Sequence, residues 1–305
     1  MLEKFRATAS QISTVIVGKE LQIRQSLTCL LAGGHLLIED LPGVGKTTLA
    51  HAMAISLGLP FRRIQFTADL LPADVIGVSV FDRATSGFVF HPGPVFTEVL
   101  LADEINRASP KTQSSLLEAM EEGQVSVDGR TRALPQPFFV IATQNPQHQV
   151  GTFPLPESQL DRFLMCISLG YPDRAAERAL LEGQPRRDLL KRLSAQAKPA
   201  DLLAAQALAA QVHVSAALLD YVQALLAVTR TAAYAEGLSP RAGLSLLAAA
   251  RAWAWFDGRG HVIPEDVQNV LPAVAGHRLR GAERGGRVLA GRELVAQLIQ
   301  SVPLP

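Results

Sequence analysis

The stretch that decides the fold is His35-Leu36-Leu37-Ile38-Glu39-Asp40-Leu41-Pro42-Gly43-Val44-Gly45-Lys46-Thr47-Thr48-Leu49-Ala50. An apolar strand runs into a glycine-containing turn, which is followed by Lys-Thr and the start of an apolar helix. This order is typical of a phosphate-binding P-loop, where backbone N–H groups and the positive end of the helix surround phosphate oxygens. Lys46 is expected to reach the β- and γ-phosphates, and the Thr47 hydroxyl to ligate Mg²⁺. The residues predicted to contact nucleotide in this stretch are Gly43, Val44, Gly45, Lys46, Thr47 and Thr48.

Asp40 departs from the usual spacing of this loop, which has a glycine five residues before Gly45. Aspartate tolerates left-handed backbone better than most side chains, so the turn remains feasible. An acid beside a triphosphate is unfavourable, and we therefore expect the Asp40 side chain to point away from the phosphates. A chance Gly-Lys-Thr after a buried strand would give the same letters, so the choice depends on the rest of the chain.

Length and composition predict a folded chain of two domains. One hydrophobic core rarely serves 305 residues, and we place the domains at 1–185 and 186–305. With 48% hydrophobic and 19% charged residues, the chain is not disordered. The net charge of +1 gives no global basic field for nucleic acid.

Cysteine usage and hydropathy indicate a cytoplasmic protein. Cys29 and Cys166 each lie in an apolar run and are interpreted as buried thiols, with no disulfide framework or metal site. No apolar run reaches the length needed to cross a membrane. The first residues, 1–6, lack the core of a signal peptide.

A helical segment precedes the P-loop strand. Residues 10–31 have a helical pattern that breaks at Val17-Gly18-Lys19. Apolar residues before a glycine, upstream of a P-loop, often cover an adenine ring, so Val17 and Gly18 are candidate nucleotide contacts. A kinked core helix explains the same letters, and the sequence leaves both interpretations open.

Two β-hairpins are expected downstream. Residues 78–90 alternate apolar and polar side chains about a Ser-Gly turn. Residues 124–134 do the same about Asp128-Gly129, which is a typical tight turn.

Two acids follow the next buried strand, 99–102. In open α/β sheets, ligands bind at the carboxyl ends of the strands. Asp103 is expected to hold Mg²⁺ through water, and Glu104 to orient and polarise the attacking water. Asn145 follows a third buried strand, 138–143, where a neutral donor can position the water or sense the γ-phosphate. Asn-Pro is also an ordinary turn.

Two arginines complete the set of candidates. Arg162 lies between apolar residues and can supply charge to a neighbouring subunit's phosphate, although a structural Arg–Asp pair has the same sequence. Arg241 follows Ser239-Pro240, which caps a helix in the Ala/Leu-rich region that begins at Asp201. A cation there opposes the helix dipole, which favours a phosphate contact.

The remaining distinctive side chains of the C-terminal part have plainer interpretations. Trp253 and Trp255 are expected to pack in the core. The arginines in a glycine-rich stretch are expected to form a solvated basic loop, because no aromatic residues interleave with them. They are Arg278, Arg280, Arg284 and Arg287.

Taken together, these residues resemble an AAA+ ATPase, and closely the MoxR family. The resemblance covers nearly the whole chain, and an acid in place of the first P-loop glycine is itself usual in that family. The matching stretches are Glu39 to Thr47, Asp103-Glu104-Ile105-Asn106-Arg107-Ala108, Ala142-Thr143-Gln144-Asn145-Pro146, Leu160-Asp161-Arg162-Phe163 and Ser239-Pro240-Arg241-Ala242.

The resemblance implies an α/β fold, a P-loop αβα domain with a five-stranded parallel sheet followed by an all-helical lid. ATP would lie between the two domains and at a subunit boundary. In this reading Lys46 and Thr47 form Walker A, and Asp103 and Glu104 form Walker B. Asn145 becomes sensor 1, Arg162 the arginine finger and Arg241 sensor 2.

The resemblance also implies assembly and partners. Relatives act as chaperone-like motors that mature or activate other protein complexes, often with a partner that bears a von Willebrand factor A domain. A ring, expected to be a hexamer, would place the two hairpins at its central pore. Arg107 is a second basic residue near the interface, and whether it serves its own or a neighbour's nucleotide stays open.

We therefore expect an ATPase, with ATP and Mg²⁺ as ligands, that remodels protein complexes. The first alternative is a nucleic-acid motor or loader, which the near-neutral charge disfavours. The second is a nucleotide-dependent scaffold without hydrolysis, which the filled hydrolytic positions disfavour. The identity of the client lies beyond the sequence.

Overall fold

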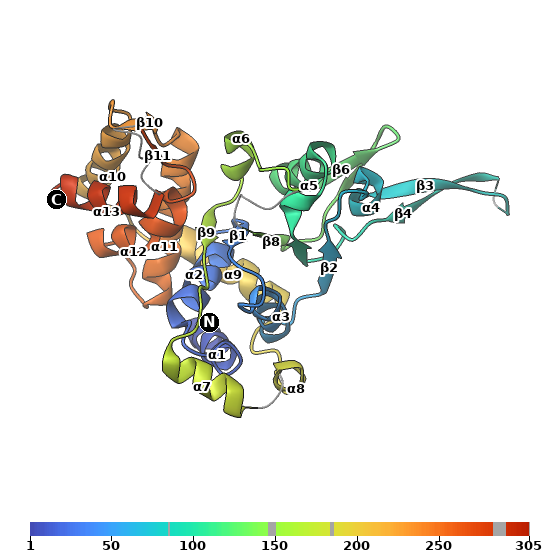
Figure 1. Ribbon diagram of the computed structural model, residues 1–305, viewed down its shortest axis with the longest axis horizontal. Coiled ribbons are helices and arrows are strands. Elements are labelled where there is room, and N and C mark those ends of the chain that lie inside the picture. Colours follow the sequence, from blue (N-terminus) through green and yellow to red (C-terminus); the bar gives the residue numbers. More distant parts are fainter. Residues whose placement is uncertain (85, 146–150, 184–185, 283–290, 305) are drawn as a thin grey trace.

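A computed structural model describes residues 1–84, 86–145, 151–183, 186–282 and 291–304 (Figure 1). Two of the arginines assigned to a basic loop, Arg284 and Arg287, lie outside these residues. So do 184 and 185, where the predicted domains meet, and the division into two domains stays a prediction.

A five-stranded parallel sheet forms the centre of the N-terminal part, as predicted, in the order β2-β5-β8-β1-β9. In register, Leu37 of β1 pairs with Ala142 of β8 and Cys166 of β9, while Leu101 of β5 pairs with Ile141 of β8. The strands are β1 (Leu36–Glu39), β2 (Phe61–Gln65), β5 (Val99–Asp103), β8 (Phe139–Gln144) and β9 (Met165–Ile167).

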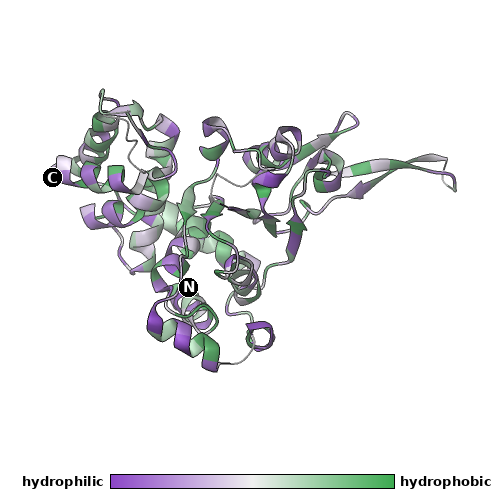
Figure 2. Ribbon diagram, viewed as in Figure 1, coloured by the Kyte–Doolittle hydropathy of each residue, from purple (hydrophilic) through white to green (hydrophobic). Residues whose placement is uncertain are grey.

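The inner strands β5, β8 and β1 are buried on both faces, because helices cover each face of the sheet. Alternate residues of a strand enter different cores: Leu36 and Ile38 face one, and Leu37 faces the other. In Figure 2 the inner strands of the sheet are apolar ribbons between helices of mixed hydropathy, whereas the edge strand β2 is largely hydrophilic. The helices of this part are α1 (Leu2–Ser13), α2 (Glu20–Leu31), α3 (Lys46–Ser56), α4 (Pro72–Ile76), α5 (Pro110–Glu122), α6 (Glu157–Leu160), α7 (Arg174–Glu182) and α8 (Arg186–Leu190), with a 3₁₀ turn at Ile105–Arg107.

The C-terminal part is a helical bundle, with only a short two-stranded ladder, β10–β11, among its described residues. Its long helix α11 packs on α9, α12 and the N-terminal helices α1 and α2, so one hydrophobic core continues from the sheet into the bundle. None of the helices in the described ranges is both long and apolar enough to cross a membrane. The elements are α9 (Pro199–Ala210), α10 (Ala216–Thr229), β10 (Tyr234–Glu236), α11 (Pro240–Phe256), α12 (Pro264–Ala275), β11 (Arg280–Gly281) and α13 (Gly291–Ser301).

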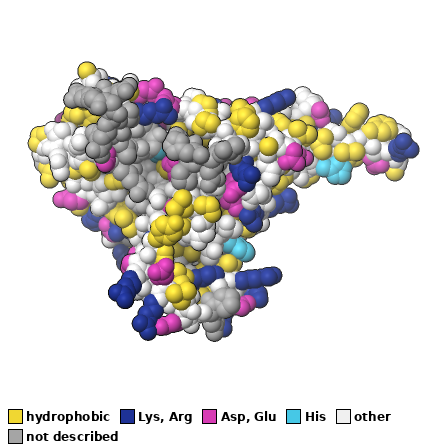
Figure 3. Space-filling view, viewed as in Figure 1, with side chains coloured by type: hydrophobic (Ala, Val, Ile, Leu, Met, Phe, Trp, Pro, Cys, Tyr) yellow, Lys and Arg dark blue, Asp and Glu magenta, His cyan; other side chains and the backbone are white. Residues whose placement is uncertain are grey.

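Both predicted hairpins are present. The first, β3 (Gly77–Asp82) with β4 (Gly87–Pro92), extends far from the body of the molecule, and its outer part carries exposed hydrophobic side chains (Figures 1 and 3). The second is β6 (Gln124–Val127) with β7 (Arg130–Ala133), and Asp128 and Gly129 both adopt the positive φ of a tight hairpin turn.

Serine side chains cap α5, α10 and α11, and the cap of α11 at Ser239 was predicted from the sequence. The Ser109, Ser215 and Ser239 hydroxyls each accept a hydrogen bond from the backbone N–H three residues later. Trp253 is buried, as predicted, and the Arg24 guanidinium lies 3.6 Å from its ring centroid.

Two interpretations of side chains were wrong. Arg278 is not solvated, because its guanidinium is buried against residues 161–164 and pairs with Asp161 at 2.7 Å. Cys166 is only half-buried on the edge strand β9, whereas Cys29 is fully buried, and burial raises the pKa of the Cys29 thiol. Neither of these two cysteines forms a disulfide.

Candidate active site

The candidate residues gather at one edge of the sheet, where four neighbouring strands end. Asp40 follows β1, Asp103 ends β5 and Asn145 follows β8. Ser168 follows β9 on the other side of β1. Parallel strands place their carboxyl ends together, which brings residues far apart in the sequence to one site.

The P-loop wraps around the Lys46 ammonium. Gly43 and Gly45 have φ of 85° and 101°, a conformation that favours glycine, and α3 begins at Lys46. Lys46 Nζ donates to the main-chain oxygen of Asp40 at 2.6 Å and to Asn145 Oδ1 at 3.1 Å. Burial lowers the pKa of Lys46 below its ordinary value, and the nearby Asp40, Asp103 and Glu104 carboxylates act in the opposite direction.

The two predicted magnesium ligands lie side by side. Thr47 Oγ1 is 3.4 Å from Asp103 Oδ2, and Thr143 Oγ1 donates to Asp103 Oδ1 at 2.5 Å. A hydroxyl, a carboxylate and substrate phosphates are donors that suit Mg²⁺, which keeps several waters. The donor set therefore fits this ion. Arg63 Nη2 also contacts Asp103 Oδ2, at 2.7 Å, and no motif in the sequence singled it out.

Glu104 lies directly beside this pair, on strained backbone. Its φ of 56° and ψ of 49° are left-handed, and its N–H donates to Thr143 Oγ1 at 2.9 Å. Its carboxylate accepts from Asn145 Nδ2 at 3.3 Å and from Arg107 Nη1 at 3.2 Å. Asn145 thus bridges Lys46 and Glu104.

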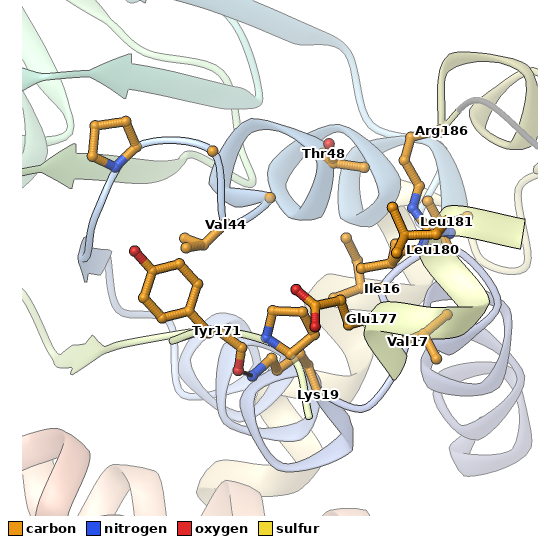
Figure 4. A pocket seen from close by; sticks show the side chains of 15 residues that line it. Ile16, Val17, Lys19, Val44, Thr48, Tyr171, Glu177, Leu180, Leu181 and Arg186 are labelled. Atoms are coloured by element: carbon orange, nitrogen blue, oxygen red, sulfur yellow. Dashed lines mark hydrogen bonds between the residues drawn. The ribbon is translucent and has the colours of Figure 1, made fainter. Parts of the chain in front are cut away.

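A cavity of about 410 Å³ opens on the far side of the P-loop (Figure 4). The predicted Val17 and Thr48 line it, together with Gly43, Val44 and Gly45, while Gly18 is not among its lining residues. Val15, Ile16, Lys19 and Pro42 complete this side of the wall. The other side comes from the segment after β9 and from α7 and α8, which no motif in the sequence marked. These residues are Tyr171, Pro172, Glu177, Leu180, Leu181 and, from α8, Arg186.

This cavity has the character of a base-binding slot. Ile16, Val44 and Leu180 give it apolar walls, and the Glu177 carboxylate points inward from α7 (Figure 4). Its position beside the P-loop suits the base of a nucleotide whose phosphates lie against Lys46. The amphipathic pattern of α7 is the one signal in the sequence that could have indicated a cover for this slot.

Arg162 and Arg241 come together elsewhere, at a second hollow of about 250 Å³ that also includes His35. Both pair with Glu121 of α5: Arg162 Nη1 lies 2.8 Å and Arg241 Nη2 2.6 Å from its carboxylate. Neither arginine lines the cavity beside its own P-loop. One chain therefore presents a nucleotide cavity and, separately, a pair of guanidinium groups held by one carboxylate.

The fold and this site define a P-loop nucleotide-binding protein with a helical lid. Residues 35–165 match the model of the ATPase family associated with various cellular activities (AAA), and residues 226–297 match the AAA lid domain. A solved structure of an ATPase candidate from Cytophaga hutchinsonii superposes with a TM-score of 0.88 at 34% identity, and the match covers 100% of this chain and 96% of that one.

Sequence relatives narrow the class. Chaperone MoxR1 of Mycobacterium tuberculosis is 43% identical over 88% of this chain and 74% of its own length. Protein MoxR of Paracoccus denitrificans is 36% identical over 90% of this chain and 88% of its own length. An uncharacterised protein of Bacillus subtilis, YeaC, is 43% identical over 96% of this chain and 92% of its own length. The chain belongs to the MoxR family of AAA+ ATPases.

Proposed function

We propose that the protein is an ATP-hydrolysing motor that works as a ring and remodels, matures or activates other protein complexes. The observation that carries the hydrolytic part is the chain of contacts Lys46–Asn145–Glu104 beside the Thr47–Asp103 pair. It joins a phosphate-binding cation, a polar sensor and an acid within hydrogen-bond distance of one another.

The residues have distinct tasks in this reaction. The P-loop N–H groups and Lys46 hold the β- and γ-phosphates, and the adjacent cavity holds the base. Glu104 accepts a hydrogen bond from the attacking water and aligns it with the γ-phosphorus, while Asn145 fixes the Glu104 carboxylate. Thr47 and Asp103 would hold Mg²⁺, which when bound neutralises charge on the phosphate oxygens.

The arginine pair gives the reason for assembly. Arg162 and Arg241 lie away from their own chain's P-loop cavity, which supports a role toward the nucleotide of a neighbouring copy. Charge supplied in this way stabilises the transition state of phosphoryl transfer. We propose a hexameric ring on the basis of the family resemblance. Arg107 pairs with Glu104 in its own chain, and its role toward nucleotide stays a prediction.

Substitution of Glu104 tests the hydrolytic assignment. Glu104→Gln keeps the size of the side chain but removes the charge that polarises the water, so turnover should fall about 100-fold or more while ATP binding persists. ATP affinity and phosphate release measure the two effects. Glu122→Gln, an exposed site on α5, is the matched control and should behave like the parent. Parental turnover in Glu104→Gln would sink the assignment.

Mixed subunits test action between copies. Arg162→Ala alone should lose hydrolysis by about 1000-fold and keep nucleotide binding. Mixing it with Lys46→Ala subunits, which retain Arg162 but cannot hold phosphate, should restore activity. Mixed rings that demonstrably form and stay inactive would count against the proposal.

The client is a protein complex in the cytoplasm, in this proposal, reached in some cases through a partner with a von Willebrand factor A domain. The chaperone name of the mycobacterial relative supports this class of work. The projecting β3–β4 hairpin, with Phe81 and Phe88 exposed, is the part best placed to contact a client (Figure 3). Proteins retained by Glu104→Gln with ATP, and lost when it is omitted, would identify the client.

A further inference from the structure

We propose that Asp40 is a positioning residue that fixes the wall of the base cavity, and that it sets nucleotide affinity rather than the rate of hydrolysis. The inference rests on the proposed nucleotide site and goes beyond it. It also accounts for the acid at a P-loop position where glycine is usual.

The Asp40 carboxylate is buried and turned away from Lys46 Nζ, which contacts only its main-chain oxygen. Oδ1 accepts from the backbone N–H of Leu41 at 2.8 Å. Oδ2 accepts from the backbone N–H of Gly170 at 2.6 Å and from Ser168 Oγ at 3.0 Å. Hydrogen bonds from neutral donors to a carboxylate are strong ones, and the two that Oδ2 accepts tie the P-loop to the segment after β9, while the one on Oδ1 lies within the P-loop.

That segment continues directly into the cavity wall. Tyr171 and Pro172, immediately after Gly170, line the cavity, and α7 then carries Glu177 and two leucines into it. The main-chain oxygen of Tyr171 also accepts from Lys19 Nζ at 2.8 Å. Asp40 and Lys19 thus hold the same short segment from two sides. Asp40 does so from the P-loop, and Lys19 from the residue that precedes α2.

Only a carboxylate satisfies this arrangement. All three groups around Asp40 are donors, so each oxygen must accept. In Asp40→Asn one of the two positions becomes an NH₂ group that faces a donor, either the Leu41 N–H or the Gly170 N–H. The substitution keeps the volume but removes the charge and one acceptor, so in either orientation it weakens the hydrogen bonds around position 40 without opening a cavity.

The experiment compares two ligands on the parent and on Asp40→Asn. Isothermal titration with ATP and with inorganic tripolyphosphate, each with Mg²⁺, separates the base cavity from the phosphate loop. We expect the Kd for ATP to rise about 10-fold, because a charge-assisted tie is lost, and the Kd for tripolyphosphate to stay within about 2-fold. In steady state, KM should rise while kcat stays within about 2-fold. Ser168→Ala, which removes one donor, should raise the Kd for ATP by about 3-fold.

Two outcomes would overturn the proposal. Equal losses for ATP and tripolyphosphate would place the effect on the phosphate loop itself, and unchanged affinity for both would leave Asp40 with no role in the wall. Thermal unfolding of each variant, with the exposed Asp220→Asn as control, shows whether the fold is retained. Should Asp40→Asn fail to fold, Ser168→Ala decides by the same comparison. A parent that binds ATP without turning it over would refute the proposed function and leave this test intact.

Discussion

His35, the residue immediately before β1, is a titrating group that the folded chain keeps neutral. Its Nδ1 accepts from the Val140 N–H at 3.0 Å, so Nε2 carries the proton and faces the Met120 main-chain oxygen at 3.2 Å. A second proton on Nδ1 would oppose the Val140 N–H. Burial lowers the pKa of His35 from 6.5 to about 4, and the hydrogen bond to the Met120 main-chain oxygen acts in the opposite direction.

The consequence is a loss of stability in acid. As pH falls through 6.5 the unfolded chain binds the proton first, so the free energy of unfolding decreases between 6.5 and about 4 and is unaffected by this group above that window. At about 1.4 kcal/mol per pH unit the effect amounts to at most roughly 3 kcal/mol. His277, whose pKa burial also lowers, acts in the same direction.

Urea unfolding at a series of pH values measures this prediction. His35→Asn places an amide oxygen near the Val140 N–H and removes the titration, so its stability should fall less steeply in acid than that of the parent. Because His277 is present in both proteins, the difference between the two curves isolates His35. Parallel curves would show that His35 titrates normally.

Most positions at the phosphate end could be predicted from the sequence, because strand ends and glycine turns fix where short side chains lie. Asp103, Glu104 and Asn145 each follow a recognisable buried strand, and the parallel sheet brings them together. Arg63 and Tyr171 could not be found in this way. Arg63 reaches Asp103 only through the pairing of β2 with β5, which no local pattern specifies.

At the scale of elements, the lid holds the loop that carries Arg162. Arg278, just after α12, donates to the Asp161 carboxylate at 2.7 Å and to the main-chain oxygen of Phe163 at 2.7 Å. Ser239, the cap of α11, contacts the same carboxylate at 3.3 Å. From the sequence, Arg278 was predicted to be solvated, because the neighbouring glycines and charges are typical of a loop. Its burial results from the packing of the helical bundle on the sheet, which the local sequence does not indicate.

Removal of Arg278 should therefore affect both folding and turnover. Arg278→Ala leaves the Asp161 carboxylate and several carbonyl groups without their donor, and should lower the free energy of unfolding by about 3 kcal/mol. Arg280→Ala, an exposed partner of Glu157, should cost less than about 1 kcal/mol. Chemical unfolding measures the stability of the two variants, and phosphate release measures their turnover. Equal losses in Arg278→Ala and Arg280→Ala would contradict the assignment of Arg278 as a buried structural contact.

At the scale of the whole molecule, the β3–β4 hairpin is separate from the folding core. Phe81 and Phe88 form an edge-to-face pair at 5.5 Å and are 52% and 75% exposed. Nearer the body, Phe90 packs on Phe96 and under the Arg132 guanidinium. The alternation of apolar and polar residues predicted the hairpin itself. It did not predict that the hairpin projects from the body, because that depends on whether other elements pack against it.

The two ends of the hairpin should therefore differ in their contribution to stability. Changing Phe81 and Phe88 together to Ser should alter the free energy of unfolding by less than about 1 kcal/mol and leave basal ATP turnover intact. Phe90→Ser should cost about 2 kcal/mol or more, because it loses a packed ring. The urea midpoint of each variant measures its loss of stability. A large loss of stability in the double variant would show that the hairpin tip is part of the core.

The left-handed backbone at Glu104 also constrains how this chain can evolve. A side chain with a Cβ costs roughly 1 kcal/mol in that conformation, which glycine adopts freely. Substitution of Glu104 by glycine would thus raise the stability of the fold and remove the proposed catalytic acid. Selection on folding and selection on turnover act in opposite directions at this codon, and lineages that abandon hydrolysis should be the ones in which glutamate is replaced there.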